Sequence, residues 1–148
     1  MSDSAAQVFQ GVVVHAQLAE LERRLVPVSV DDLPPPEVIG FRIEGRPELA
    51  VRVLWVSEDR RTAVLIEKCG PCKVIGRHFT EVFYFLTGRC TFRRPDGTEY
   101  EVKGGDFACY AEGQPEEATV HETFIKCSMY HSSRPLPYEV TPDPPSTQ

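Results

Sequence analysis

The sequence predicts a single all-β domain of the sandwich or barrel type. The chain has 148 residues, of which 41% are apolar, and this suits one domain with one hydrophobic core. Short runs rich in β-branched and aromatic residues recur at intervals of roughly 8–12 residues. Turn-forming residues separate them, most clearly at Pro95-Asp96-Gly97, where Asp-Gly supplies the positive φ that a tight hairpin needs.

The predicted strands fill the centre of the chain. They are expected over residues 51–56, 62–67, 82–86, 90–93, 98–102, 107–111 and 123–131. The turns between them are expected at residues 58–61, at Gly88, at 95–97, at Gly104-Gly105 and at 113–115.

The two ends of the chain lack this strand pattern. Leu18, Leu21 and Leu25 recur at helical spacing, which predicts a short amphipathic helix over residues 15–25. Prolines 34–36 predict an extended connector after that helix. Residues 134–148 hold five prolines and few bulky apolar side chains, which indicates an extended tail outside the core. We therefore expect an N-terminal strand and helix extension at 1–37, a barrel at 38–133 and a Pro-rich tail at 134–148.

Charge and composition narrow the partners and the compartment. The net charge of -6 argues against binding to nucleic acid or to an anionic membrane surface. No apolar run approaches the ~18 residues of a membrane span, and the N-terminus has no signal-peptide pattern. The five cysteines are an odd number and indicate reduced thiols, so we expect a cytoplasmic protein.

Residues 70–133 contain two motifs defined by glycine spacing. The first comprises Gly70, Gly76-Arg77-His78, Glu81 and Gly88, and the second Gly105, Gly113, Pro115, Glu116 and Val120. These spacings resemble the two conserved motifs of the cupin superfamily. The resemblance implies a double-stranded β-helix, that is, a jelly-roll barrel with a small-molecule pocket inside, in agreement with the strand pattern.

Within the superfamily, the chain is similar to small cupins of the ureidoglycine aminohydrolase and ethanolamine-utilisation type. The similarity lies in Thr80-Glu81, Leu86-Thr87-Gly88, the Gly105-Asp106 turn and Lys126 in the closing strand. Cupins of this kind usually form homodimers in which N-terminal segments complete the partner's sheet. Residues 8–14 are the candidate strand for that pairing here.

The usual metal ligands of the superfamily are incomplete in this chain. Gly76 stands at the first His position and Glu116 at the His position of the second motif, which leaves His78 and Glu81. Residues three apart on a regular strand point to opposite faces, so these two could share a metal only across a β-bulge. We therefore predict no metal and no other cofactor, with a divalent ion as the minor alternative.

Glu81 is the first candidate functional residue, because a carboxylate among phenylalanines needs either a partner or a role. It either acts on a ligand or forms a salt bridge with Arg77 on the same face. Lys126 is the second candidate. If the polar face of the alternating segment 125–130 lines the barrel, Lys126 faces Glu81 as a cation for an anionic ligand; otherwise it points outward. The remaining expected pocket residues are Arg77, His78, Phe83, Glu116 and Tyr130.

Cys69-Gly70-Pro71-Cys72 reproduces the active-site motif of thioredoxins. That motif needs a helix directly after it, whose N-terminus lowers the pKa of the first thiol. Gly76 and the β-branched and aromatic residues of 82–86 disfavour such a helix, so we interpret the motif as a turn entering the barrel.

Three functions therefore stay open at this point. The chain is an enzyme acting on a small polar or anionic metabolite, with Glu81 as acid, base or orienting group and Lys126 as its charge partner. Alternatively it is a non-catalytic small-molecule-binding module that uses the same residues. The third hypothesis is a thioredoxin-like redox protein that uses Cys69 and Cys72.

Overall fold

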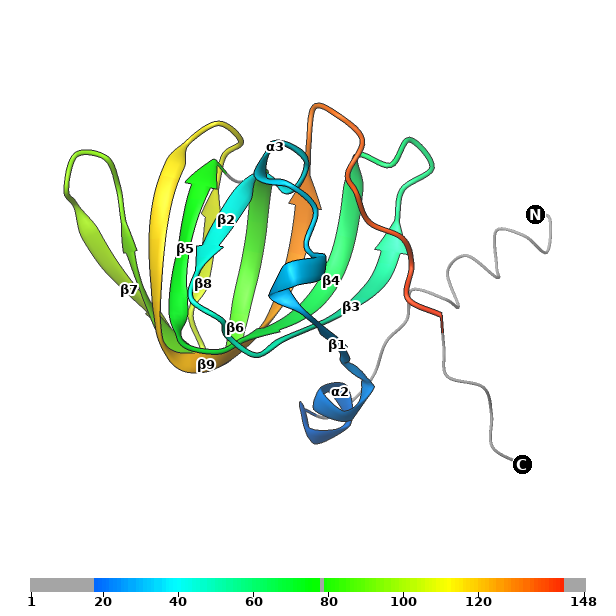
Figure 1. The fold of residues 1–148 in the computed structure, drawn as a ribbon, viewed down its shortest axis with the longest axis horizontal. Helices are drawn as coiled ribbons and strands as arrows, with labels where there is room; N and C mark the ends of the chain where they lie inside the picture. Colours follow the sequence, from blue (N-terminus) through cyan, green and yellow to red (C-terminus); the bar gives the residue numbers. More distant parts are fainter. Residues whose placement is uncertain (1–17, 78, 143–148) are drawn as a thin grey trace.

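The computed structural model describes residues 18–77 and 79–142. Its strands are β1 (Val26–Val28), β2 (Phe41–Glu44), β3 (Leu49–Val56), β4 (Thr62–Cys69), β5 (Cys72–Arg77), β6 (Thr80–Arg93), β7 (Glu99–Lys103), β8 (Phe107–Tyr110) and β9 (Pro115–His131). The helical elements are α2 (Leu18–Arg24), the 3-10 turn η1 (Val30–Asp32) and α3 (Pro36–Ile39). The fold is an all-β jelly-roll barrel with a short N-terminal helix, as predicted (Figure 1).

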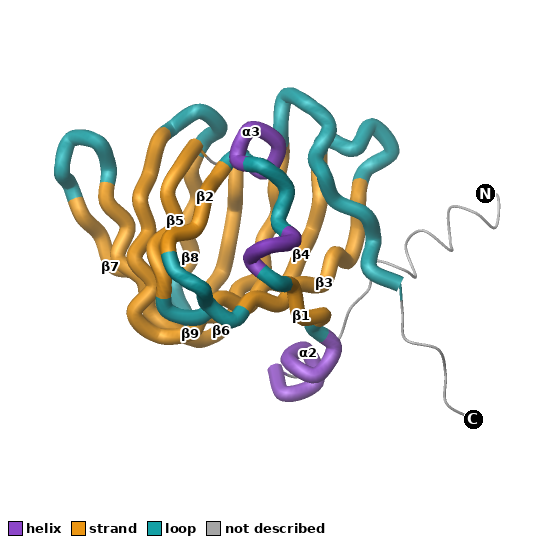
Figure 2. Tube along the Cα trace, viewed as in Figure 1, coloured by secondary structure: helices purple, strands orange, loops and turns teal. Residues whose placement is uncertain are grey.

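Strand β9 organises the barrel, because β4, β5 and β6 all pair with it. The pairs are antiparallel: β6 lies along one edge of β9, while β5 and then β4 occupy the other edge. Strands β3 and β1 extend the sheet beyond β4, strand β2 extends it beyond β5, and β7 and β8 pair with β6. The long strands are curved, and the N-terminal elements η1 and α3 lie on the near side of the sheet in the view of Figures 1 and 2.

Strand β6 is longer than the two separate strands predicted over 82–86 and 90–93. It runs unbroken through Gly88, and its register against β9 shifts between Phe85 and Cys90. A Cβ at Gly88 would lie 2.4 Å from Cα of Phe124, so only glycine fits this bulge. Because of the shift, both Phe85 and Cys90 are buried despite their odd spacing.

The N-terminal part of the barrel differs from the predicted extended connector. Residues 26–44, which we call the strap, contain β1, η1, α3 and β2 rather than one extended segment. Pro36 begins α3, where a proline needs no N–H partner, and Gly40 ends it with a φ of 85°. The prediction missed β1, β2 and β5. The candidate strand at 8–14 and the start of the predicted helix lie outside the described residues.

The C-terminal segment also departs from its prediction. Residues 134–142 pack back on the barrel, and Leu136 is only 2% exposed. Its backbone N–H donates to the carbonyl of Arg60, and Thr141 exchanges hydrogen bonds with the backbone of Val53. The expectation that the tail stays outside the core is wrong for these residues. None of the helices in the described part of the chain has the length and apolar character of a membrane span.

Candidate functional site

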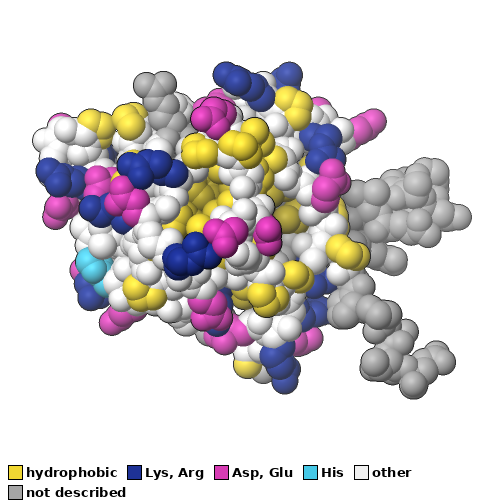
Figure 3. Space-filling view, viewed as in Figure 1, with side chains coloured by type: hydrophobic (Ala, Val, Ile, Leu, Met, Phe, Trp, Pro, Cys, Tyr) yellow, Lys and Arg dark blue, Asp and Glu magenta, His cyan; other side chains and the backbone are white. Residues whose placement is uncertain are grey.

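The interior of the barrel holds a cavity of about 160 Å³. Its walls are mainly apolar, with Phe85 and Cys90 on β6 and Ala118, Val120 and Phe124 on β9. The strap covers one side of the opening and contributes further apolar residues, namely Val28, Leu33, Ile39, Phe41 and Ile43. Figure 3 shows the corresponding hollow, with yellow apolar side chains in its walls and charged side chains around its rim.

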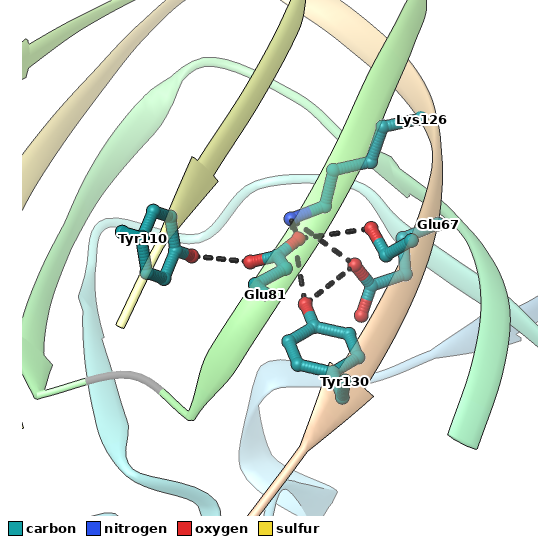
Figure 4. Close-up of polar contacts among 6 residues, drawn as sticks. Glu67, Glu81, Tyr110, Lys126 and Tyr130 are labelled. Carbon is teal, nitrogen blue, oxygen red and sulfur yellow. Dashed lines mark hydrogen bonds and ion pairs between the residues drawn. The ribbon is translucent and has the colours of Figure 1, made fainter. Parts of the chain in front are cut away.

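One end of the cavity is polar. We call the six residues there the buried polar cluster; they come from β4, β6, β8 and β9 and are Glu67, Glu81, Tyr110, Lys126, Ser128 and Tyr130 (Figure 4). Side chains two positions apart on a strand point to the same face, so Lys126, Ser128 and Tyr130 on β9 all face the interior. The cluster therefore brings together side chains that are far apart in the sequence.

Glu81 lies at the centre of this cluster and has no exposed surface. Its Oε2 atom accepts hydrogen bonds from Lys126 Nζ at 2.6 Å and from Ser128 Oγ at 2.9 Å. The hydroxyl of Tyr110 donates to its Oε1 atom. Three donors that converge on one carboxyl group suit an ionised carboxylate, which only accepts hydrogen bonds.

Lys126 is enclosed by acceptors and by aromatic rings. Besides Glu81, its Nζ atom lies 3.3 Å from Glu67 Oε2 and 3.4 Å from Tyr130 Oη. It also lies 5.1 Å above the ring of Phe83. Burial works against the charged form, but attraction by Glu81 and Glu67 outweighs it and raises the pKa of Lys126. Lys126 is therefore a permanent cation inside the barrel.

Glu67 is the carboxyl group of the cluster that is most open to the cavity. Its side chain is 21% exposed, compared with 1% for Glu81. Its Oε2 atom accepts a hydrogen bond of 2.9 Å from the hydroxyl of Tyr130. Burial raises the pKa of Glu67, and the opposing effects of Lys126 and Tyr130 do not cancel that rise. Burial also raises the pKa of Tyr110 and of Tyr130, so both phenols remain donors.

The structure brings only some of the predicted site residues together. Glu81, Lys126 and Tyr130 meet in the cluster, which settles the alternation of 125–130 in favour of an inward polar face. Phe83 is buried beneath Lys126 but does not line the cavity. The side chain of Arg77 and all of His78 lie outside the described residues.

Glu116 takes part in a separate contact. It is buried at the start of β9, where both carboxyl oxygens accept from the hydroxyl of Tyr100, at 3.0 and 3.2 Å. Arg94 lies 4.0 Å from the same carboxyl group and stacks on the Tyr100 ring. Burial raises the pKa of Glu116. The predicted pocket role of Glu116 is not matched by a position in the cavity wall.

The redox hypothesis does not fit the surroundings of the two cysteines. Cys69 ends β4 and Cys72 begins β5, so a strand and not a helix follows the motif. Their sulfur atoms lie 3.6 Å apart, and the contact with Cys72 is the main cause that raises the pKa of Cys69. A thioredoxin needs the opposite shift at its first cysteine. The thioredoxin-like alternative is therefore unsupported, and the motif forms a turn at the barrel wall.

Comparison with known proteins agrees with this architecture. The family described as the EutQ-like cupin domain matches residues 56–127, which include β4 to β8 and much of β9. No curated protein matches the chain by sequence. Residues 56–127 are a cupin domain.

Solved structures show how far the fold is shared. The EutQ protein of Clostridium difficile is 12% identical over 59% of this cupin and 70% of that chain, with a TM-score of 0.51. A protein of unknown function from Pseudomonas syringae is 19% identical over 71% of this cupin and 43% of that chain, with a TM-score of 0.58. A cupin-like protein of Thermotoga maritima is 14% identical over 67% of this cupin and 78% of that chain, with a TM-score of 0.53. These identities establish a shared fold.

The metal-ligand set of the superfamily does not fit the residues of this cupin. Gly76, at the first His position, pairs with Phe41 of the strap, and a Cβ there would lie 2.7 Å from the carbonyl of Gly40. Strand β2 thus occupies the space that a histidine side chain would need. Among the described residues, no three His, Cys, Asp or Glu side chains lie close enough to hold a metal ion.

Sequence reasoning missed Glu67, although a signal was present. Residues 63, 65, 67 and 69 share the inward face of β4, and Glu67 is the charged one among them. A charged residue among apolar inward-facing residues needs either a partner or a functional role, as Glu81 does. Tyr110 and Ser128 were also missed, because their roles depend on the position of Glu81.

Proposed function

We propose that this cupin binds a small molecule in the barrel cavity, with an apolar body against the walls and one polar group against the buried polar cluster. The observation that carries the proposal is the cluster itself: charged side chains of β4, β6 and β9 meet at one end of an otherwise apolar cavity. The homodimer and the cytoplasmic location remain predictions.

The size of the cavity limits the ligand. A dry protein cavity of about 150 Å³ holds a benzene molecule. The cavity of about 160 Å³ therefore suits a ligand of roughly six to ten non-hydrogen atoms. Small-molecule sites of this kind combine apolar walls with a few convergent polar groups, which is the arrangement found here.

The energetic cost of the cluster supports a role beyond folding. Removing two carboxyl groups and an ammonium group from water costs several kcal/mol per ion, and apolar side chains of similar size often replace such groups without loss. The cluster lies against the cavity, and its Glu67 side chain keeps 21% of its surface exposed. A ligand whose polar group contacts this cluster would explain why the charged residues are kept inside the barrel.

Acid or base chemistry on the bound molecule is the second candidate function, and the observation that favours it is Glu67. Its pKa is raised by burial beside a cavity, which is typical of groups that exchange protons with a substrate. Glu81, the residue proposed for this role from the sequence, has a side chain that is only 1% exposed, so it offers a ligand far less surface than Glu67. Glu81 instead fixes the position of Lys126.

A cavity-filling variant tests the binding proposal. Ala118 is buried in the cavity wall, so Ala118→Leu should abolish the rise in Tm that small ligands of six to ten heavy atoms produce in the wild type. Thr119→Leu is the matched control, because this neighbour on β9 points to the outer face. Equal Tm responses in wild type and Ala118→Leu, or no response to any ligand of that size in wild type, would refute the proposal.

A further inference from the structure

The hydrogen-bond donors of Lys126 are fully used inside the cluster. An ammonium group has three N–H bonds and no acceptor. Three acceptors surround Nζ, namely Glu81 Oε2 at 2.6 Å, Glu67 Oε2 at 3.3 Å and Tyr130 Oη at 3.4 Å. A ligand would have to break one of these contacts to bind Lys126 directly. Lys126 is therefore a positioning residue and not the partner of an anionic ligand.

The hydroxyl donors are used in the same way. Tyr110 and Ser128 each donate to Glu81, and Tyr130 donates to Glu67. Each hydroxyl has a single O–H bond, so none of the three has a proton left for a ligand. The donors of the cluster thus satisfy its own acceptors.

One carboxyl oxygen remains open toward the cavity. Oε2 of Glu67 accepts from both Tyr130 and Lys126, whereas Oε1 has no hydrogen-bond partner among the described residues. No dashed line reaches this second oxygen in Figure 4, and Glu67 is one of the residues that line the cavity. If Glu67 carries a proton, the proton sits on Oε1, because two donors already point at Oε2.

We propose that Oε1 of Glu67 donates a hydrogen bond to the carbonyl oxygen of the ligand, which is a small aldehyde, ketone, ester or amide with an apolar body. This inference rests on the proposed function and names the ligand class for the same site. A carbonyl oxygen accepts a hydrogen bond and brings no polar hydrogen that would need a partner in the apolar walls. A ligand carboxylate would add a buried charge without an available N–H donor of Lys126.

The surroundings of Glu67 support the protonated form. Burial raises the pKa of Glu67, and the neighbouring carboxylate of Glu81 on β6 acts in the same direction. The other ionisable groups facing it are Lys126 and Tyr130 on β9, Tyr110 on β8 and Tyr138 beyond β9. The three phenols stay neutral because burial raises the pKa of each. Carbonyl binding should therefore weaken as the pH rises through the raised pKa of Glu67.

Two probes with the same ring separate the chemical classes: cyclohexanone, and cyclohexylamine in its ammonium form. Binding is measured by calorimetry between pH 5 and pH 8 for wild type, Glu67→Gln and Glu67→Leu. In Glu67→Gln, the donors of Tyr130 and Lys126 hold the amide oxygen at the Oε2 position, which turns the amide NH₂ toward the ligand. Glu67→Gln should therefore keep cyclohexanone affinity within about threefold and lose its pH dependence, and Glu67→Leu should lose about tenfold.

An infrared readout reports the hydrogen bond itself. The C=O stretching frequency of bound cyclohexanone should be lower in wild type and Glu67→Gln than in Glu67→Leu, in which no donor remains at this position. The inference is overturned if cyclohexylammonium binds more tightly than cyclohexanone with affinity that rises with pH, or if Glu67→Leu leaves the cyclohexanone affinity unchanged. Both outcomes leave the proposed function intact, whereas a wild type that binds neither probe nor other ligands of this size refutes the proposed function itself.

Discussion

Lys126 and Glu81 form an ion pair although they are not partners in the strand register. Glu81 lies opposite Tyr130, whereas Lys126 lies opposite Phe85, four positions further along β6. The Lys126 side chain therefore extends along the barrel interior to place Nζ 2.6 Å from Glu81 Oε2. This diagonal contact joins two strands inside an apolar core and fixes the geometry of the polar end of the cavity.

Removing Glu81 should strongly destabilise the protein. Breaking a buried ion pair by deleting one partner typically costs about 3–5 kcal/mol, because the other charge stays buried. Glu67 remains near Lys126 in Glu81→Leu, so we expect a loss near 3 kcal/mol in the free energy of unfolding measured with urea. Glu122→Leu, which removes a carboxylate 4.0 Å from Arg89 on the surface, should change stability by less than about 0.5 kcal/mol.

A double variant distinguishes the stranded charge from lost packing. In Glu81→Leu with Lys126→Met, no ammonium group is left without its partner, so the double variant should be more stable than Glu81→Leu alone. The account would be contradicted if the double variant lost, relative to wild type, the sum of the stability losses of Glu81→Leu and Lys126→Met measured separately.

Alternation along strands allowed much of the fold and part of the site to be predicted. Strands β3, β4, β8 and β9 have strong β-branched and aromatic content, and the inward polar face at Lys126 was one of two stated interpretations. Strand β5 was hidden because its first residue, Cys72, belongs to a motif that suggests a helix. Strand β2 was missed because its four residues come soon after the prolines at 34–36 and were assigned to the extended connector.

The remaining misses depend on tertiary packing. The strap and the segment 134–142 contain prolines and short polar runs, so their local sequence indicates irregular structure. Both segments are ordered by contacts with the barrel, at Ile39 and at Leu136, that local propensity does not encode. Glu67 was missed because its partner Lys126 lies opposite it on the neighbouring strand β9, and the local sequence of β4 does not encode that pairing.

The pH dependence of stability should report the buried Glu67. Its pKa is raised in the folded state above the ordinary value of 4.5, so the folded protein binds this proton more tightly than the unfolded chain. The corresponding stability is fully present below pH 4.5 and is lost as the pH rises toward the raised pKa, by at most about 1.4 kcal/mol per pH unit. Glu67→Gln cannot ionise there, so it should gain stability relative to wild type between pH 5 and pH 8 in urea unfolding. Parallel stability curves for the two proteins would contradict the buried protonated form.

Replacing Gly76 by alanine should destabilise the protein. A Cβ at this position would lie 2.7 Å from the carbonyl of Gly40 and 2.8 Å from Cα of Phe41, both backbone atoms of the strap. Gly97 also has a positive φ, of 87°, but nothing lies within 4 Å of its Cβ position. Gly76→Ala should therefore lose about 1–3 kcal/mol more stability than Gly97→Ala in parallel urea titrations. Equal losses would mean that backbone strain alone, and not the strap, requires glycine at Gly76.

Leu136 should behave as a core residue although it follows the barrel strands. It is 2% exposed and packs in a cluster with Val53, Leu65 and Tyr130, which includes a member of the buried polar cluster. Leu136→Ala should therefore cost about 2–5 kcal/mol in the free energy of unfolding. Val140→Ala, at a residue that is 51% exposed in the same segment, should cost less than about 0.5 kcal/mol.

The same variant tests whether this segment supports the site. Because Leu136 and Tyr130 share one apolar cluster, a gap at Leu136 lets the Tyr130 ring shift and lengthens its hydrogen bond of 2.9 Å to Glu67. Leu136→Ala should then weaken binding of a cavity ligand as well as lower Tm, whereas Val140→Ala should change neither. If Leu136→Ala is as stable as Val140→Ala, residues 134–142 do not belong to the core, and the site is formed by the barrel strands and the strap alone.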